Sequence, residues 1–410
     1  MRTGEGRAAI SRYAAVLHGV TGDSHHVVSP LGAWMLLSYC STAARGDLRR
    51  RLAEVLGAEP SEALRWCTGL MSRPHPLVGL AQGVWQRGGD TAELANWKAD
   101  LPPEIGTGLI PSPVELDAWA ARHTLGLIEK FPAAVSPITV LLLASVVSTD
   151  ITWTTPFETV SATELGPRSP WRMQLHRALR SPKRSDAQMF IADTARAGRV
   201  AVFETRTNGM RLISVIAADE IAATDVIAAA YQVAAGAMGN EASGCSVRSL
   251  FDLPLGDEPT WVIEEEHVMT TDPAGREETY TATVPAWSAL TELELTEQLA
   301  TGYPLAAAAL ADALAMNGAP SVAKQATAAN YTATGFQAAS ITSMTLVTGP
   351  APKTRRGRRR HCHLRFGHPH AVVAIAEAPA GEVSPWHGLP VFSAWVAEPK
   401  DPEAAPKPRD

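Results

Sequence analysis

The sequence has few cysteines, no long apolar run and no apolar leader at its N-terminus. The four cysteines (Cys40, Cys67, Cys245 and Cys362) are far apart and form no Cys-x-x-Cys pair, which argues against a disulfide framework and a thiolate zinc site. The longest apolar run, residues 138–147, is too short to span a bilayer, and the basic N-terminus lacks the apolar stretch of a signal peptide. We therefore expect a cytoplasmic protein without a membrane span, metal or cofactor.

The chain has 410 residues, of which 46% are hydrophobic, and a net charge of -6. A globule of this size buries about three quarters of its unfolded surface, so a full apolar core is expected, and the length alone suggests two or three domains. No Gly-x-Ser-x-Gly elbow or phosphate-binding glycine loop is present, so neither motif indicates an enzyme.

Helix signals dominate the first part of the chain. Ser29 followed by Pro30 is typical of a helix start, because a serine hydroxyl accepts a free backbone N–H and proline needs no donor at the first position. The apolar residues that follow predict a buried helix. Asp47 is expected to cap a second, amphipathic helix that ends at Gly57.

Strand signals dominate the rest. The β-branched, apolar residues 138–147 predict a strand buried on both faces, at the centre of a large sheet. Asn208 and Gly209 between two apolar runs predict a hairpin. Two alanine-rich helices are expected at 219–238 and 304–316, and further strands at 260–270, 279–285, 363–375 and 389–397. This order favours an α+β fold with a large, mostly antiparallel central sheet.

Several segments, taken in order, carry a family resemblance. They are HHVVSPLGAWMLLSYCSTAARGDLRRRLAEVLG, VLLLASVVSTDITWTTPF, VAKQATAANYTATGFQAASIT, RFGHPHAVVAIA and LPVFSAWVAEP. Together they resemble the first helices, the central strand with its Trp-x-x-Pro-Phe, the hinge strand and the two closing strands of the serpins, the serine protease inhibitors and their non-inhibitory relatives. The resemblance implies one serpin-like domain over residues 1–399, a reactive-centre loop at about 335–363, and a flexible charged tail at 400–410.

In the mechanism that the resemblance implies, the protein is no enzyme but offers a loop to a protease. The protease forms an acyl bond with the loop, and the cut loop inserts into the central sheet as a new strand. The residues expected to control sheet opening are Ser29, Ser145, Trp153 and Gln325, where Ser145 and Gln325 replace the asparagine and histidine of the family pattern. Both replacements are polar and able to form hydrogen bonds.

The segment after the hinge has the composition that insertion requires. The hinge residues are Ala333, Thr334, Gly335, Phe336, Gln337, Ala338, Ala339, Ser340 and Thr342. They are uncharged and mostly small, so they suit both a solvated loop and a buried strand. Two of them depart from the family pattern: Ala333 replaces an acidic residue, and Phe336 replaces a small one. Packing a phenyl ring into a filled site typically costs about 1–3 kcal/mol, so Phe336 is expected to slow insertion.

A basic run follows, with Lys353, Arg355, Arg356, Arg358, Arg359 and Arg360. Counting forward from the hinge places the cleaved bond near Gly349–Pro350, whereas counting backward from Phe366 places it at Arg358–Arg359, with Arg355 and Arg356 as other candidates. We favour the arginines, because a trypsin-like or subtilisin-like protease with an acidic specificity pocket suits them. We expect the inhibitor to be a monomer.

Alternative interpretations of the basic run, the histidines and the glutamates remain at the level of sequence. The same six cations also suit a solvated loop, or a non-inhibitory protein that binds a polyanion or a partner protein through them. The histidines and cysteine at 361–363, 368 and 370 include metal-ligand types but match no zinc spacing. The cluster Glu264–Glu266 lacks the second histidine of a catalytic motif and is expected at a solvated strand edge.

Overall fold

The structure is a computed structural model that describes residues 3–124, 126, 128–131, 136, 139–149, 151–153, 155–182, 187–207, 209–239, 243–313, 321–336, 354–378 and 382–402. Its helices are α1 (Thr3–Thr21), α2 (Pro30–Ser41), α3 (Gly46–Leu56), α4 (Pro60–Met71), α5 (Ala92–Ala99), α6 (Pro113–His123), α7 (Ala223–Ala237) and α8 (Tyr303–Ala313). None of the helices in these ranges is long and apolar enough to cross a membrane.

The strands form three main sheets and one short pair. The five-stranded sheet has the order β15 (Trp287–Glu294), β16 (Ser321–Tyr331), β4 (Leu141–Thr149), β2 (Val78–Gln86) and β3 (Gly106–Leu109). The seven-stranded sheet has the order β1 (His26–Val28), β20 (Leu389–Val396), β19 (His370–Ala376), β10 (Met210–Ile216), β9 (Gly198–Thr207), β8 (Gln188–Thr194) and β11 (Ser246–Arg248). The six-stranded sheet has the order β12 (Gly256–Asp257), β13 (Trp261–Thr270), β18 (Arg355–Arg365), β14 (Arg276–Val284), β7 (Arg177–Arg180) and β6 (Glu158–Ser161), and β17 (Gly335–Phe336) pairs with β5 (Ile151–Thr152).

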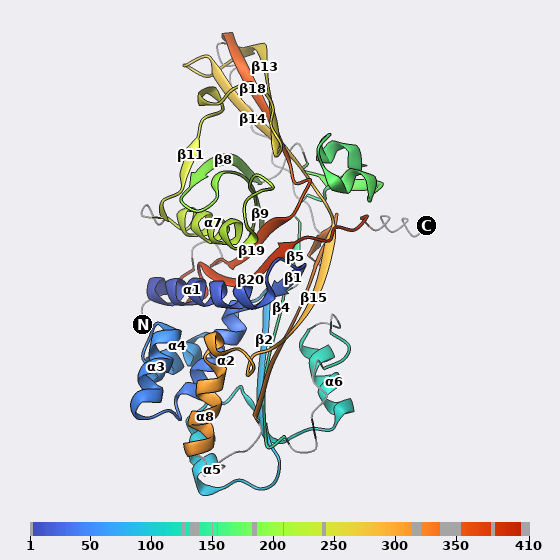
Figure 1. Ribbon diagram of the computed structural model, residues 1–410. Coiled ribbons are helices and arrows are strands. Elements are labelled where there is room, and N and C mark those ends of the chain that lie inside the picture. Colours follow the sequence, from blue (N-terminus) through green and yellow to red (C-terminus); the bar gives the residue numbers. More distant parts are fainter. Residues whose placement is uncertain are drawn as a thin grey trace.

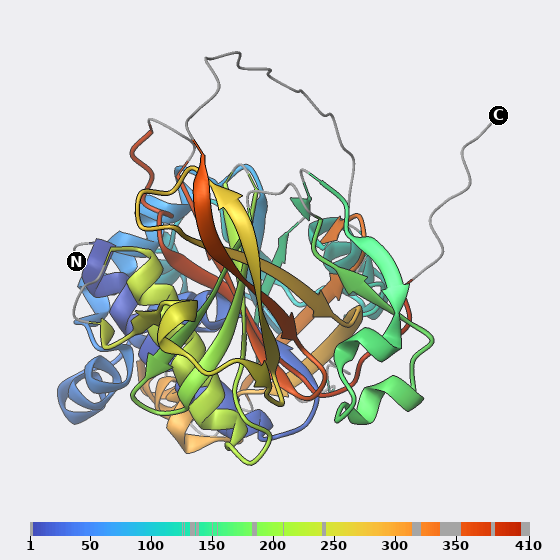
Figure 2. The same ribbon diagram turned by 90° about the horizontal axis from the view of Figure 1, so that it is seen from above.

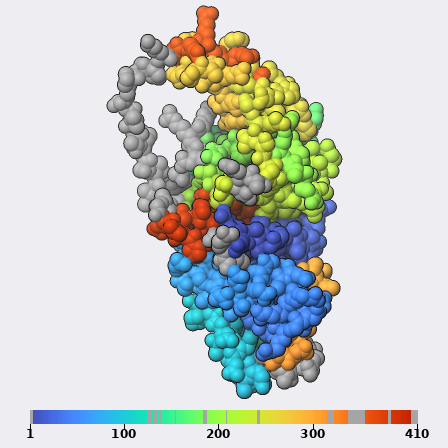
Figure 3. All heavy atoms as spheres, turned by 90° about the vertical axis from the view of Figure 1, so that its left-hand side faces the viewer, coloured from blue at the N-terminus to red at the C-terminus, as the bar shows by residue number. Residues whose placement is uncertain are grey.

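The five-stranded sheet lies between two helical layers (Figure 1). Helix α6 covers one face, where Trp85 of β2 packs against Trp119 with ring centroids 5.2 Å apart. Helix α2 lies on the other face and is buried along its whole length. Figure 3 shows the N-terminal helices in the lower part of the molecule and β13, β14 and β18, in yellow and orange, at the top.

The architecture confirms the expected α+β class. Most strand pairs are antiparallel, and the described exceptions are β2–β3, β4–β16 and β14–β18. The strand expected at 138–147 is β4, in the middle of the five-stranded sheet. The hairpin is also confirmed, since Thr207 of β9 pairs with Met210 of β10.

Three expectations need correction. Asp47 lies inside α3 rather than at its cap, because the helix already begins at Gly46. The strand expected at 363–375 is divided into β18 and β19, and between them a Cβ at Gly367 would lie 2.5 Å from the Leu165 carbonyl oxygen. The first residues of the tail expected at 400–410 are bonded to the sheet, since Asp401 accepts hydrogen bonds from the backbone of β7 at Arg177, 2.8 Å away; residues 403–410 lie outside the described ranges.

Two buried histidines join α1 to the seven-stranded sheet. His26 Nδ1 lies 2.7 Å from the Ser24 carbonyl oxygen and therefore donates, which leaves Nε2 of the neutral ring as an acceptor for His18 Nδ1 at 2.6 Å. His18 Nε2 then accepts from the Ser393 hydroxyl at 2.7 Å, and Tyr231 donates to Ser393 Oγ at 2.9 Å. These directions hold with both rings neutral, and a proton on each ring would bring two N–H groups face to face at the His18–His26 contact.

We expect stability to fall as pH decreases below about 6.5, the unperturbed histidine pKa. Burial lowers the pKa of His18 to about 3 and also lowers the pKa of His26, so the unfolded chain binds protons that the folded chain does not. Between the unfolded pKa of about 6.5 and the folded pKa of about 3, the proton on His18 alone should decrease the free energy of unfolding by about 1.4 kcal/mol for each pH unit of acidification. Urea unfolding at pH 7.5, 6.5 and 5.5 measures this, and His18→Gln should show a shallower dependence. If the free energy of unfolding depended on pH equally in the wild type and in His18→Gln, His18 would not be the group responsible.

Candidate functional site

The first part of the site is the contact between the N-terminus of α2 and β16. Gln325 holds Ser29 through two bonds, since its Oε1 accepts from the Ser29 N–H at 3.1 Å and its Nε2 donates to the Ser29 carbonyl oxygen at 2.8 Å. Ser29 Oγ caps α2 at Gly32 N and donates to Val391 O at 2.8 Å. Both side chains are 1% exposed. These bonds therefore fix β16 to the buried helix.

The second part is a polar row that crosses the sheet beneath α2. Ser145 of β4 lies directly opposite Gln325 of β16 and, on its other side, opposite Gln82 of β2. Gln82 Nε2 donates to Ser145 Oγ at 3.2 Å and to the Gly32 carbonyl oxygen at 3.3 Å. A Cβ at Gly32 would lie 2.8 Å from Ser145 Oγ, so only glycine lets α2 approach this closely.

The structure thus brings together three of the four residues named for sheet opening, Ser29, Ser145 and Gln325. Sequence reasoning missed Gln82, whose only signal was a glutamine within a mostly apolar strand. Trp153 lies elsewhere, beyond the end of β4, where its ring packs on Tyr331 with centroids 5.3 Å apart and its Nε1 donates to Thr332 O at 3.0 Å.

The seam between β4 and β16 is short and parallel. Residues 321–326 pair with 141–146, whereas β15 and β16 pair over the longer register 287–294 with 324–331. After β16 the chain reverses direction, so that β17 runs antiparallel to β5, the short strand that follows β4. A strand placed between β4 and β16 would run antiparallel to both, and antiparallel ladders are somewhat more stable per residue than parallel ones.

The first hinge residues lie beside the chain that follows β4. Gly335 and Phe336 pair antiparallel with Thr152 and Ile151, and a Cβ at Gly335 would lie 2.3 Å from Ile151 O. The preceding carbonyls are also bonded, since Thr334 O accepts from Trp153 N at 3.2 Å and Ala333 O from Phe157 N at 2.8 Å. The side chain of Phe336 and the hinge residues Gln337, Ala338, Ala339, Ser340 and Thr342 lie outside the described residues.

The basic run occupies a strand, which corrects the expected exposed loop at 335–363. Arg355–Arg365 form β18, which pairs antiparallel with β13 and parallel with β14, and the three strands lie side by side at the top of the molecule (Figures 1 and 2). The Arg358–Arg359 bond is therefore enclosed by two neighbouring strands. From the sequence these arginines were expected to have no ion-pair partner, because their partners lie about ninety residues away along the chain.

Glutamates on both neighbours pair with the arginines. Arg359 lies 3.0 Å from Glu266 of β13 and 2.8 Å from Glu277 of β14, while Arg360 lies 2.8 Å from Glu265. The Arg360 hydrogen bond lowers the pKa of Glu265. Two of the three glutamates expected at a solvated edge, Glu265 and Glu266, are thus ion-paired with β18, whereas Glu264 is exposed.

The remaining cations also differ from a free basic loop. Arg358 pairs with Glu265 at 3.3 Å, and Arg355 Nε donates to Asp272 O at 3.0 Å. Arg356 is exposed, and Lys353 lies outside the described residues. Four of the six cations are thus bonded within the protein, to three glutamates or to the Asp272 carbonyl oxygen.

The histidines of β18 contact a ladder of threonines on β14. His361 lies 3.1 Å from both Thr279 Oγ1 and Thr281 Oγ1, and His363 lies 2.8 Å from Thr281 Oγ1. Burial lowers the pKa of His363 to about 4. No group of three metal-ligand side chains capable of holding an ion occurs in the described part of the chain.

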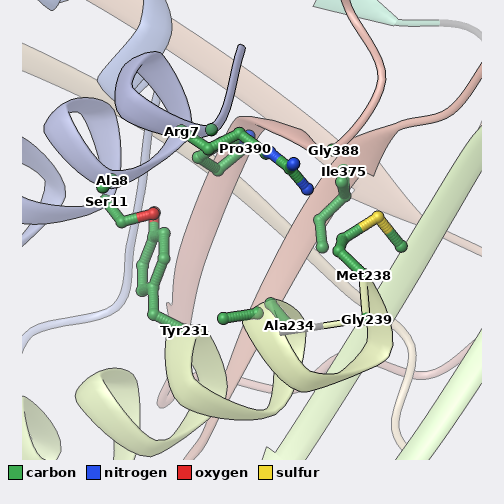
Figure 4. A pocket seen from close by; sticks show the side chains of 12 residues that line it. Arg7, Ala8, Ser11, Tyr231, Ala234, Met238, Gly239, Ile375, Gly388 and Pro390 are labelled. Carbon is green, nitrogen blue, oxygen red and sulfur yellow. The ribbon is translucent and has the colours of Figure 1, made fainter. Parts of the chain in front are cut away.

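A cavity of about 500 Å³ lies between α1, α7 and the C-terminal strands (Figure 4). Arg7 and Ser11 line it from α1, Tyr231 and Met238 from the α7 side, and Ile375 from β19. Arg7 lies across Gly388, where a Cβ would be 2.7 Å from its guanidinium. No side-chain hydrogen bond or ion pair of Arg7 occurs within the described ranges, so this cation is available to an anionic ligand.

Comparison with known proteins agrees with this geometry. No family model matches the chain. A rice protein, "Putative serpin-Z6C" of Oryza sativa subsp. japonica, is 30% identical over 36% of this chain, and the match spans 41% of the length of that relative. The structure of tengpin, a thermophilic serpin in its native state, superposes with a TM-score of 0.63 at 13% identity over 95% of this chain and 93% of its own.

Two further solved structures cover almost the whole chain. They are thyroxine-binding globulin in complex with thyroxine (TM-score 0.61, 12% identity, 97% of this chain and 99% of its own) and human glycosylated kallistatin (TM-score 0.61, 11% identity, 98% and 99%). At these identities the likeness establishes the fold.

We expect Gln325→Leu to destabilise the protein by about 1–3 kcal/mol, because the buried Ser29 N–H loses its acceptor. Urea unfolding at pH 7.5 measures the change. Gln298→Leu is the control, since Gln298 is exposed and its replacement should change stability by no more than about 0.5 kcal/mol. Equal stabilities of the two variants would contradict the role given to Gln325.

We also expect trypsin to leave the native chain uncut between residues 355 and 365, although five arginines lie close together at 355–360. A protease binds its substrate as an extended strand with free backbone edges, and both edges of β18 are paired. Mass spectrometry of the first fragments identifies the cuts. An early cut after Arg358 in the folded protein would show that β18 is not held as described.

Proposed function

We propose that this chain, which has the serpin fold, inhibits serine-type endopeptidases by insertion of a cut loop into the five-stranded sheet. It acts as a substrate that traps the protease rather than as an enzyme. The proposal rests first on the parallel β4–β16 seam, with β17 entering antiparallel at its upper end.

The segment that would insert has suitable residues. Residues 337–347 contain no charge and no proline, so a strand formed from them can be buried without an unpaired charge or a missing backbone donor. Such a strand would extend β17 downward between β4 and β16 and exchange one parallel ladder for two antiparallel ones.

The bait position is proposed between the hinge and β18. Lys353 is the only cationic residue from 337 to 354, so with Arg358 and Arg359 held in β18 it becomes the candidate recognised by a trypsin-like or subtilisin-like protease of basic preference. The bond to be cut is then Lys353–Thr354. Cleavage there would release the loop from β18 while leaving the hinge attached to β16.

The test is formation of a covalent complex. The protein is incubated with trypsin-like and subtilisin-like proteases, and denaturing gels are examined for a 1:1 adduct. We expect an adduct with the wild type and its loss in Lys353→Ala with the trypsin-like enzymes. The unfolding temperature of the cut protein should also rise by more than about 10 °C, because a new strand adds several kcal/mol and each kcal/mol shifts the midpoint by roughly 2–4 °C in a large domain.

Cleavage without an adduct and without a rise in unfolding temperature would refute inhibition. It would favour the second candidate, a non-inhibitory binding protein with the serpin fold. The observation that favours this candidate is the α1–α7 cavity with its available Arg7 (Figure 4). Phe336→Thr further separates the inhibitory candidate from the non-inhibitory one. If this variant formed an adduct that the wild type does not form, Phe336 would be the residue that prevents loop insertion.

A further inference from the structure

Four arginines lie on one face of the three strands β13, β18 and β14, which extend together at the top of the molecule (Figure 1). Arg356, Arg358 and Arg360 alternate along β18, and Arg276 of β14 lies directly opposite Arg358. Side chains alternate between the two faces of a strand, and residues that lie opposite each other share a face. We call the face defined by these four residues the arginine face.

The carboxylates of the arginine face leave most of its positive charge unbalanced. Glu265 on β13 and Glu278 on β14 lie opposite Arg360. Glu265 pairs with both Arg358 and Arg360. Glu278 instead accepts from the Leu250 N–H at 3.0 Å, and it forms no ion pair with an arginine within the described ranges. One ion-pairing carboxylate thus serves the whole face.

A phenyl ring keeps three of the guanidinium groups together. Their carbons lie around the Phe251 ring, at 5.1 Å from its centroid for Arg276, 5.7 Å for Arg358 and 4.9 Å for Arg360. A cation beside an aromatic ring is attracted by it, which offsets part of the repulsion between like charges. A guanidinium group that stacks on a ring still has its N–H groups free at its edge.

Three of the four arginines are open to solvent. Arg276 and Arg356 are exposed, and neither forms a side-chain hydrogen bond or an ion pair with another described residue. The Arg358 side chain is 46% exposed and has one ion pair, at 3.3 Å. Arg360 differs, because its side chain is 12% exposed and its Nη1 donates to two backbone carbonyl oxygens.

The three exposed arginines form a small triangle. Arg276 and Arg358 lie on neighbouring strands with backbones about 4.8 Å apart, and Arg356 lies about 6.6 Å from Arg358 along β18. Toward the body of the protein the triangle ends at Arg360, which is bonded already. A long polyanion would therefore meet few further cations on the described part of this face, whereas a compact anion with several charges meets all three.

We propose that the arginine face binds a short inorganic oligophosphate, with Arg276, Arg356 and Arg358 as the donors and the Phe251 ring as the support of two of them. Guanidinium groups bind phosphate oxygens in bidentate pairs, and groups held in place before binding lose less entropy. The bound chain of phosphates bridges β14 and β18. Binding requires neither a protease nor loop insertion, so it is independent of the proposed function.

Calorimetry at pH 7.5 measures the binding of tripolyphosphate to the full chain, with orthophosphate as the single-phosphate probe. We expect tripolyphosphate to bind at least about ten-fold more tightly, because it reaches several guanidinium groups at once. Equal affinities, or no binding of tripolyphosphate up to millimolar concentration, would overturn the proposal. Tighter binding of a heparin hexasaccharide than of tripolyphosphate would also overturn it, since the face would then prefer a longer sulfated chain.

Variants locate the site. Arg276→Gln should weaken tripolyphosphate binding about ten-fold, and Arg356→Gln several-fold. Arg355→Gln is the matched control, because it removes the same charge from the opposite face of β18, and its affinity should stay within about two-fold of the wild type. Phe251→Leu keeps every charge but removes the ring, and should weaken binding several-fold.

Two results would overturn the assignment of the site. If Arg355→Gln weakened binding as much as Arg356→Gln, the anion would respond to the overall charge of the three strands rather than to the arginine face. If Arg276→Gln or Phe251→Leu bound tripolyphosphate as the wild type does, the probe would lie elsewhere.

Discussion

The structure depends on one short seam between two parallel strands. Over six residue pairs β4 and β16 are joined directly, and α2 is fixed to that seam through Gln325, Ser29 and the Gly32 contact with Ser145. A parallel pair is the weaker ladder, so the helix contacts matter more here than elsewhere in the sheet. The polar row from Gln325 to Gln82 is fully buried, and its side-chain hydrogen bonds join β16 to the start of α2, and β2 to β4 and α2.

The two ends of the loop are held very differently. On the hinge side, β17 is a two-residue strand that pairs with β5 alone. On the other side, β18 is an eleven-residue strand between two neighbours, with ion pairs to both. Because detaching β18 would break two ladders at once, movement of an intact loop into the seam is disfavoured from that end. Movement from the hinge after a cut upstream of β18 breaks neither ladder.

The elements that local pattern determines could be predicted from the sequence. Ser29 with Pro30 started α2 where expected, and the turn at Gly209 joined β9 to β10. The residues that depend on distant partners could not. Nothing near Arg359 in the sequence shows that Glu266 and Glu277 lie on either side of it, so a paired strand looked like a free basic loop. Gln82 was missed for the same reason, since its role follows only from facing Ser145 across β2 and β4.

The register of β18 is set by its buried apolar residues rather than by its charges. Each ion pair is partly exposed, and exposed pairs contribute little free energy. Yet Arg359 meets Glu266 and Glu277 on the same level of both neighbours, while Arg360 meets Glu265 on the other face. A slip of one residue would turn every arginine to the opposite face of the sheet, but because the arginines are consecutive, the next one would take each place beside the same carboxylates. The slip would, however, move Cys362 and Leu364 out of the core, where both are fully buried. The apolar residues of β18 thus select one position for the strand that follows the loop, and that position sets how much chain remains between β18 and the hinge.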